Sequence, residues 1–378
     1  MPDEDSQDGA PQVLIQSGSS LGLHAWQVSW RLIALIAILT LAVIGFGGAR
    51  ISAAGNAAVG DQHVQQLASF GDAIAGQHGV VPAMEDEVGV LADYVAEGRP
   101  QSANDLLLPQ ANQAVTNLAS AQAESLASKF GPGYPQQVQA AGTTVDEQIQ
   151  QIKDLRVQAL RTQAPALGVI EAYTNSANIL LSVDDQIAST SGDPQLSADV
   201  RALGSLSQAE NSAAEERAIL NAVLTRESWQ PGEAVTLSDA SVQERSAITQ
   251  FQADVPDSEF TSYLATVSGS PVITANEMLA DAVGDGQTAV VPGNPAGSEF
   301  PTAQKTWQED MTYEINQMRQ VQQNLLNAIQ ARSQVLHLQA THAVTDDWIE
   351  MLAVVAAVMG LAVVAGRRSS PSRRIHWI

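Results

Sequence analysis

The sequence predicts an all-α protein in which long helices form two stacked four-helix bundles outside a membrane, flanked by two transmembrane helices. Residues 52–347 are rich in Ala, Gln, Leu, Ser and Glu, and they show no alternation of apolar and polar residues that would indicate strands. Proline and glycine interrupt this composition at intervals that suit helices of several turns. Two apolar stretches bracket the segment, and each is close to the ~20 residues that a helix needs to cross a bilayer.

The breaks at proline and glycine predict the helices one by one. Pro165, Pro194 and Pro301 each stand in the first turn of a predicted helix, where proline is tolerated because no hydrogen-bond donor is needed. Long helices are expected at 52–75, 81–98, 103–129, 135–162, 165–190, 194–226, 238–253 and 301–345, and shorter helices at 257–267 and 274–283. This set of long helices matches a pair of four-helix bundles stacked away from the membrane.

The apolar stretches run from Leu32 to Ala49 and from Trp348 to Gly366. Arginines but no acidic residues follow the second stretch, and the positive-inside rule therefore places both termini in the cytoplasm. The protein is expected in the cell membrane. Its predicted parts are a disordered cytoplasmic tail at 1–30, a transmembrane helix at 31–51, an extracytoplasmic domain at 52–347, a transmembrane helix at 348–366 and a short basic cytoplasmic tail at 367–378.

A cleaved signal peptide is the alternative interpretation of the first apolar stretch. We favour an uncleaved anchor, because the apolar run is longer than the usual 7–15-residue core of a signal peptide and follows some thirty other residues. The short tail after the second stretch predicts that the chain carries no output domain of its own. Any signal would then pass to a separate partner such as a histidine kinase.

The last predicted helix carries a heptad seam. Its positions alternate in steps of four and three residues, with polar interruptions at Gln322 and Arg332. Such a seam fits a helix that relays a signal in a homodimer, and it also fits a bundle helix that only packs. The seam residues are Met311, Ile315, Met318, Gln322, Leu325, Ile329, Arg332 and Leu336.

Composition and motifs exclude several functional classes. The formal net charge of −23 repels nucleic acid, whose binding needs Lys and Arg on phosphates. The absence of cysteine excludes disulfides and thiolate metal sites. The sequence contains no phosphate-binding loop, dinucleotide fingerprint, H-E-x-x-H or G-x-S-x-G motif. We therefore expect no enzymatic activity, no cofactor, no metal ion and no nucleic-acid partner.

Two pairs of adjacent carboxylates, Asp184-Asp185 and Glu215-Glu216, are the nearest approach to a catalytic pair. Neighbouring residues on a helix point about 100° apart, so the two members of a pair cannot easily share a substrate. We expect these side chains to be solvated.

The run from Leu206 to Leu220 (LSQAENSAAEERAIL) resembles the second signature of the nitrate- and nitrite-sensing (NIT) domain. That domain is typical of actinobacterial membrane sensor kinases and of some bacterial regulators. The similarity extends to residues 172–173 and 179–181, to residues 94–100 (YVAEGRP), and to the second half of the domain. It covers roughly residues 55–340.

The resemblance implies an all-helical sensor of two four-helix bundles, in which an arginine from each of two helices grips nitrate or nitrite. The second of these arginines falls on Arg217. A guanidinium group is a planar fork of donors, which suits a planar oxyanion. The alternative is an arginine on a helix surface that pairs with nearby glutamates.

The first arginine position departs from the family pattern. Where the family places a Glu-Arg pair, this sequence has Glu87-Val88, and Val88 cannot donate to an anion. Lys153, Arg156 or Arg161 from a neighbouring helix are candidates to replace it.

The preferred interpretation is a membrane-anchored extracytoplasmic sensor that binds nitrate, nitrite or another small anion, with Arg217 in contact with the anion. The alternative is a degenerate helical bundle that acts as an interaction or structural protein of the cell envelope and has no small-molecule ligand.

Overall fold

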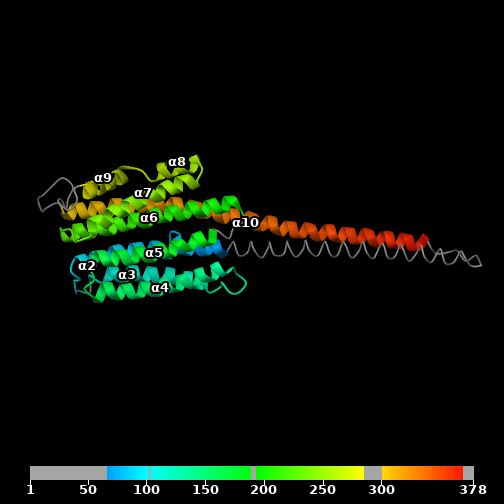
Figure 1. Ribbon diagram of the computed structural model, residues 1–378, viewed down its shortest axis with the longest axis horizontal. Coiled ribbons are helices and arrows are strands. Elements are labelled where there is room, and N and C mark those ends of the chain that lie inside the picture. The colour runs from blue at the N-terminus through cyan, green and yellow to red at the C-terminus, as the bar shows by residue number, and fades with distance from the viewer. Residues whose placement is uncertain (1–65, 101, 103, 189–192, 285–299, 369–378) are drawn as a thin grey trace, which may run out of the picture. The chain divides into compact units, whose positions relative to one another are not determined.

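The computed structural model of the chain describes residues 66–100, 102, 104–188, 193–284 and 300–368, and over these residues the protein is all-helical (Figure 1). Residues 59–339 make up one compact unit. Of the described residues, 340–368 belong to a second unit. After a helical segment at 66–75 come α2 (Val80–Ala96), α3 (Leu107–Ala127), α4 (Gln136–Arg161), α5 (Ala166–Ala188), α6 (Pro194–Arg226), α7 (Glu233–Asp254), α8 (Asp257–Thr266), α9 (Ser270–Gly284) and α10 (Phe300–Arg368).

The helix ends follow the breaks that proline and glycine predict. α6 has the predicted bounds, and α4, α5 and α8 begin and end within one or two residues of theirs. The predicted break after residue 75 is also present, because α2 begins only at Val80. α7 begins at Glu233, one turn earlier than predicted, and α10 continues past residue 345 to Arg368.

Local signals at both ends of α6 explain its agreement with the prediction. Asp193 caps the N-terminus, since its Oδ1 accepts a hydrogen bond of 2.8 Å from the backbone N–H of Leu196, and Pro194 occupies the first turn. At the other end, Glu227 adopts a left-handed conformation with φ of 58°, and the N–H of Ser228 donates back to the carbonyl of Val223. This reversal ends the helix.

Two groups of helices pack side by side within residues 59–339 (Figure 1). In the first group, α2 contacts α3, α4 and α5, and α4 contacts both α3 and α5. In the second, α6 contacts α7, which in turn contacts α8 and α9. α6 also contacts α2 and α5 of the first group. Hydrogen bonds from Trp307 and Arg319 attach α10 to α6.

α6 is the central helix of this unit, and its middle section is buried all round. Every residue from Ala209 to Leu224 is buried, although the stretch includes several charged and amide side chains. Charged residues are almost never fully buried unless they are paired. α6 therefore needs polar partners from neighbouring helices. The buried charged and amide residues are Glu210, Asn211, Glu215, Glu216, Arg217 and Asn221.

The predicted seam of α10 is buried over most of its length. Six of its members lie in the interior: Met311, Ile315, Met318, Gln322, Leu325 and Ile329. The pattern then ends, because Arg332 is partly exposed and pairs with Asp193 at 2.8 Å. Ser333 takes the buried position in that turn.

The membrane-spanning segments stay a prediction. Among the described residues, we find no helix with both the length and the apolar character that a bilayer crossing requires. The first predicted span, 31–51, lies outside the described residues. Of the second, 348–366, the structure describes the helical backbone and almost none of the side chains.

Candidate functional site

Three helices turn polar faces toward one another within the unit of residues 59–339. On each helix the polar residues recur mostly at three-, four- or seven-residue steps, which places them on one face. These faces consist of Glu85, Asp86 and Asp93 on α2, Ser207, Glu210, Arg217 and Asn221 on α6, and Thr312, Arg319 and Gln322 on α10.

Arg217 of α6 lies at the meeting point of the three helices. Its side chain is only 3% exposed. Its Nη2 donates to the main-chain oxygen of Glu85 at 3.2 Å and to Oδ1 of Asp86 at 3.1 Å, and its Nη1 donates to Oγ1 of Thr312 at 3.2 Å. Its Nε has no hydrogen-bond partner in the described part of the chain, so this guanidinium has capacity for a further acceptor.

A second buried guanidinium, that of Arg319 on α10, reaches the same place. Its Nη2 donates to Oε2 of Glu85 at 3.0 Å and to the main-chain oxygen of Pro82 at 3.3 Å. Its Nε pairs with Glu210 of α6, and its Nη1 contacts Oδ2 of Asp86 at 3.2 Å. Arg319 thus joins α10 to both α2 and α6.

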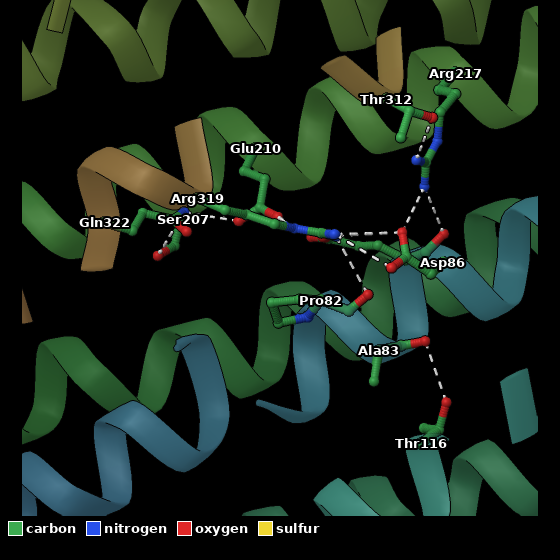
Figure 2. Close-up of polar contacts among 11 residues, drawn as sticks. Pro82, Ala83, Asp86, Thr116, Ser207, Glu210, Arg217, Thr312, Arg319 and Gln322 are labelled. Atoms are coloured by element: carbon green, nitrogen blue, oxygen red, sulfur yellow. Dashed lines mark hydrogen bonds and ion pairs between the residues drawn. The ribbon is translucent and has the colours of Figure 1, made fainter. Parts of the chain in front are cut away.

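Asp86 lies between the two arginines. Figure 2 shows both guanidinium groups pointing toward its carboxylate, which accepts hydrogen bonds from each. Burial alone would raise the pKa of this carboxyl, but the positive charges of Arg319 and Arg217 hold the pKa below its ordinary value. Asp86 is therefore ionised at neutral pH. Its side chain is 43% exposed, whereas those of both arginines are buried.

Two buried glutamates complete the surroundings of Arg319. Glu210 pairs with Arg319 and also accepts a 2.7 Å hydrogen bond from Nε2 of Gln322. Burial, together with the nearby charge of Glu210, raises the pKa of Glu85 well above its ordinary value. Oε1 of Glu85 has no partner among the described residues. The raised pKa favours the protonated, neutral form of Glu85.

The polar contacts continue along α2 and α6 by two further turns. Asp93 accepts two hydrogen bonds from Nδ2 of Asn221, both at 2.5 Å, and one from Thr225 at 3.3 Å. Nε2 of Gln304 on α10 donates to Oγ1 of Thr225 at 2.7 Å. Burial raises the pKa of Asp93 to about 6. The same three helices are thus joined a second time.

The structure places the residues considered for the first arginine position. Val88 is buried on α2 and lines a small cavity of about 10 Å³ with Tyr173 and Ala214. Arg156 is committed to Glu87, which it contacts at 2.5 and 2.8 Å. The other two candidates, on α4, are not at the site: Lys153 is exposed and bonded to Gln150, and Arg161 is exposed.

Arg319, Asp86 and Glu210 are the site residues that the sequence reasoning missed. Arg319 comes three residues before the polar seam residue Gln322 and shares its face of α10. The three-residue spacing of Arg319 and Gln322 is the signal from which a polar contact in this turn of α10 could have been predicted.

The prediction that Glu215 and Glu216 are solvated is wrong, because α6 is enclosed by other helices on every side. The two side chains do face different neighbours. Burial and the charges of Glu171 and Asp239 raise the pKa of Glu215 to about 7. Burial and the charges of Glu244 and Glu314 raise that of Glu216 well above its ordinary value. The side chains of Asp184 and Asp185 lie outside the described residues. Across the described ranges no three His, Asp or Glu side chains are placed to hold a metal ion.

Comparisons with known proteins agree with this architecture. The sequence matches the model of a family described as "Nitrate and nitrite sensing" (NIT) over residues 79–330. A search of curated proteins finds no match. A solved structure of the NasR transcription antiterminator is similar in fold, with 17% sequence identity, a TM-score of 0.62 and coverage of 82% of this chain and 80% of that one. The family match takes in α2 to α9 and the part of α10 that carries Arg319. The chain belongs to the nitrate and nitrite sensing family.

Proposed function

We propose that the protein is a sensor that binds nitrate or nitrite through Arg217 of α6 and Arg319 of α10. The observation that supports this most directly is the convergence of two buried guanidinium groups on one partly exposed carboxylate. Membership of the family supplies the class of ligand.

The chemistry of the site favours a small planar anion. Each guanidinium offers its N–H donors in one plane, and a planar oxyanion accepts them side by side. Both groups keep their charge when buried, and hydrogen bonds to charged groups are stronger where water is excluded. The carboxylate of Asp86 shows that the two arginines can hold a planar anionic group of this size together.

Calorimetric titration of the full chain with sodium nitrate and sodium nitrite tests the proposal. We expect wild-type protein to bind at least one of these anions, and Arg217→Lys to lose the binding because lysine keeps the charge but not the fork of donors. Arg201→Lys is the matched control, since Arg201 lies on the same helix, is half exposed and pairs with Asp254 away from the site. Binding should be unchanged in that variant.

Two results of this titration would contradict the proposal. Wild-type protein that takes up neither anion contradicts the proposal. Equal affinities of wild type and Arg217→Lys would show that the anion binds elsewhere.

We also propose that the helices form two four-helix bundles, with α2 to α5 in one and with α6, α7 and α10 in the other. In the second bundle the short helices α8 and α9 together take the place of the fourth helix. The contacts within each group support this division. Amide hydrogen exchange tests this division, because the helices of one bundle are expected to open as one cooperative unit. If the amides of α5 exchanged with the same opening free energy as those of α6, and not as those of α4, this division would be contradicted.

Membrane anchoring is the third part of the proposal, with spans at 31–51 and 348–366 and residues 52–347 outside the cytoplasm. The apolar sequences and their flanking arginines support it. The chain has no cysteine, so single cysteines report topology cleanly. A membrane-impermeant maleimide should label Ser125→Cys in intact cells and Ser6→Cys only after lysis. Labelling of Ser6→Cys in intact cells would reverse the assignment.

A second candidate function is an interaction module of the cell envelope without a small-molecule ligand. It is favoured by an uncharged face on α3, where large apolar side chains are exposed: Leu107, Leu108, Val115 and Leu118. Replacing Leu118 by glutamate tests this candidate in sedimentation experiments. A change in association state without any change in anion binding favours the interaction module.

A further inference from the structure

We propose that Asp86 is an internal anion that occupies the arginine pair in the unliganded protein, and that a bound nitrate or nitrite ion displaces it. This inference rests on the proposed function and specifies how the same site is regulated. It assigns Asp86 the role of a built-in competitor that sets the apparent affinity.

The carboxylate of Asp86 lies where a bound anion would have to lie. Asp86 accepts a hydrogen bond from Nη2 of Arg217 at 3.1 Å and from Nη1 of Arg319 at 3.2 Å, so it bridges the two guanidinium groups (Figure 2). A carboxylate, a nitrate ion and a nitrite ion are all planar groups whose oxygens accept from a guanidinium fork. An anion that uses both arginines must therefore take the place that Asp86 holds.

Asp86 is far more exposed to solvent than the two neighbouring glutamates. The side chain of Asp86 is 43% exposed, whereas the side chains of Glu85 and Glu210 are 3% and 1% exposed. A carboxylate that leaves the arginines must be rehydrated, because an unpaired buried charge is costly. Of these three carboxyl groups, Asp86 alone has ready access to solvent. The two buried glutamates stay as fixed parts of the site.

The balance of charge favours a monovalent ligand. The carboxylate of Asp86 places one negative charge between the guanidinium groups of Arg217 and Arg319. When Asp86 swings out, the site loses that charge. A monovalent anion restores it, whereas a divalent anion would add a further negative charge in a buried place.

Displacement also changes which helices the arginines join. With Asp86 in place, the carboxylate ties α2 to both α6 and α10. A free anion in the same position joins α6 to α10 without a covalent link to α2. Main-chain oxygens of Pro82 and Glu85 continue to hold α2, so the expected change is a loosening of this contact rather than a separation.

The test is calorimetric titration of full-length wild type, Asp86→Asn and Asp86→Ala with sodium nitrate and sodium nitrite at constant ionic strength. Removing an internal competitor increases the fraction of binding-competent protein, and we expect both variants to bind about tenfold more tightly than wild type. Two variants are used so that the test remains possible if Asp86→Ala fails to fold. Asp86→Asn keeps the shape of the side chain and removes only its charge. Asp193→Asn removes the same charge at an exposed pair with Arg332, retains a good helix cap, and should bind like wild type.

A further variant distinguishes displacement of Asp86 from a simpler effect, in which removing the negative charge of Asp86 only reduces its repulsion of an anion that binds nearby. In the Asp86→Ala background, Arg319→Lys keeps the charge but removes the fork, and it should weaken binding if the anion sits between the two arginines. An unchanged affinity would place the anion beside Arg217 only and overturn the inference.

The remaining outcomes are also decisive. Equal or weaker binding by both Asp86 variants, with wild type still binding, overturns the internal-competitor role and leaves the proposed function intact. Absence of binding in wild type and in all variants instead refutes the proposed function itself.

Discussion

The indole Nε1 of Trp307 donates a 3.0 Å hydrogen bond to the main-chain oxygen of Arg217, the residue of α6 whose side chain contacts Asp86. Trp307 is fully buried on α10. The bond connects α10, the helix that carries Arg319, to the backbone of Arg217. It thereby fixes the axial position of α10 along α6, and with it the relative position of the two arginines.

Replacing Trp307 by phenylalanine should lower the free energy of unfolding by about 1–3 kcal/mol, because a buried hydrogen bond and part of the packing are lost. It should also weaken nitrate binding through a shift of α10 against α6. Trp229→Phe is the control, since Nε1 of the half-buried Trp229 has no partner among the described residues. Denaturant unfolding and calorimetry measure both effects. A larger loss of stability in the control would contradict this account.

The buried pair of Arg156 and Glu87 should be the most sensitive polar contact of the first helix group. Glu87 is fully buried and accepts from Nε and Nη2 of Arg156 and, at 3.0 Å, from the hydroxyl of Tyr173. Removing one partner leaves the other as an uncompensated buried group, which costs about 3–5 kcal/mol. We expect Arg156→Met to fall in this range in chemical denaturation.

The double variant Glu87→Gln/Arg156→Met should recover a large part of that loss, since it removes both charges. A second double-mutant cycle, on the exposed pair of Lys305 and Glu309, 3.7 Å apart on α10, serves as the comparison. Its coupling energy in the free energy of unfolding should be small. Additive effects at Glu87 and Arg156 would mean that the pair is not the source of stability.

The buried carboxyl groups shared by α6, α7 and α10 predict a stability that falls as pH rises. Burial and the charge of Glu244 raise the pKa of Glu314 to about 8, and burial raises that of Glu244 to about 7. Both values lie above those of the unfolded chain, so between about pH 5 and pH 8 the folded state binds more protons. Stability is therefore lost through this window. Each pKa unit corresponds to about 1.4 kcal/mol.

Thermal unfolding at pH 5.5 and pH 8.5 measures this effect. The melting temperature of wild type should be lower at pH 8.5. Glu314→Gln should raise it at that pH and reduce the difference between the two conditions. Glu309→Gln, at an exposed position of the same helix, should leave the difference unchanged. A wild-type melting temperature that rises with pH would contradict the assignment.

The helices could be predicted from the sequence because their limits depend on local chemistry. Asp193 and Pro194 define the start of α6 through a side-chain cap and a first-turn proline, and both signals lie within a few residues. The predicted helix end at residue 345 is wrong, because no proline or glycine follows before Gly360 and α10 continues through 348–366, which was also predicted to be helical.

Only part of the site could be predicted. The resemblance to the family made Arg217 a candidate, but the position of Arg319 depends on Glu210 and Asp86, which are 109 and 233 residues away in the sequence. The burial of Glu216 was missed for a related reason. Its direction on the helix was correctly inferred, but whether that direction meets water or another helix is decided by the packing of α7 and α10 around α6.

The left-handed residue that ends α6 predicts a stabilising substitution. Glu227 has φ of 58°, a conformation that costs a residue with a Cβ about 1 kcal/mol, and its negative charge lies at the unfavourable end of the helix dipole. Glu227→Gly removes both penalties and should raise the free energy of unfolding by about 0.5–1 kcal/mol in chemical denaturation. Anion binding should not change.

Arg99 is the matched comparison, because it has nearly the same φ, 59°, but its side chain has a structural role. Its Nε donates to the main-chain oxygen of Ala159 at 2.9 Å, and its Nη2 donates to that of Ala164 at 2.5 Å. Arg99→Gly relieves the same backbone strain but leaves these carbonyl groups without the guanidinium, so it should destabilise the protein. If both glycine variants were stabilised equally, backbone strain would outweigh the side-chain contacts at both sites, and the hydrogen bonds of Arg99 would contribute nothing measurable to the junction of α4 and α5.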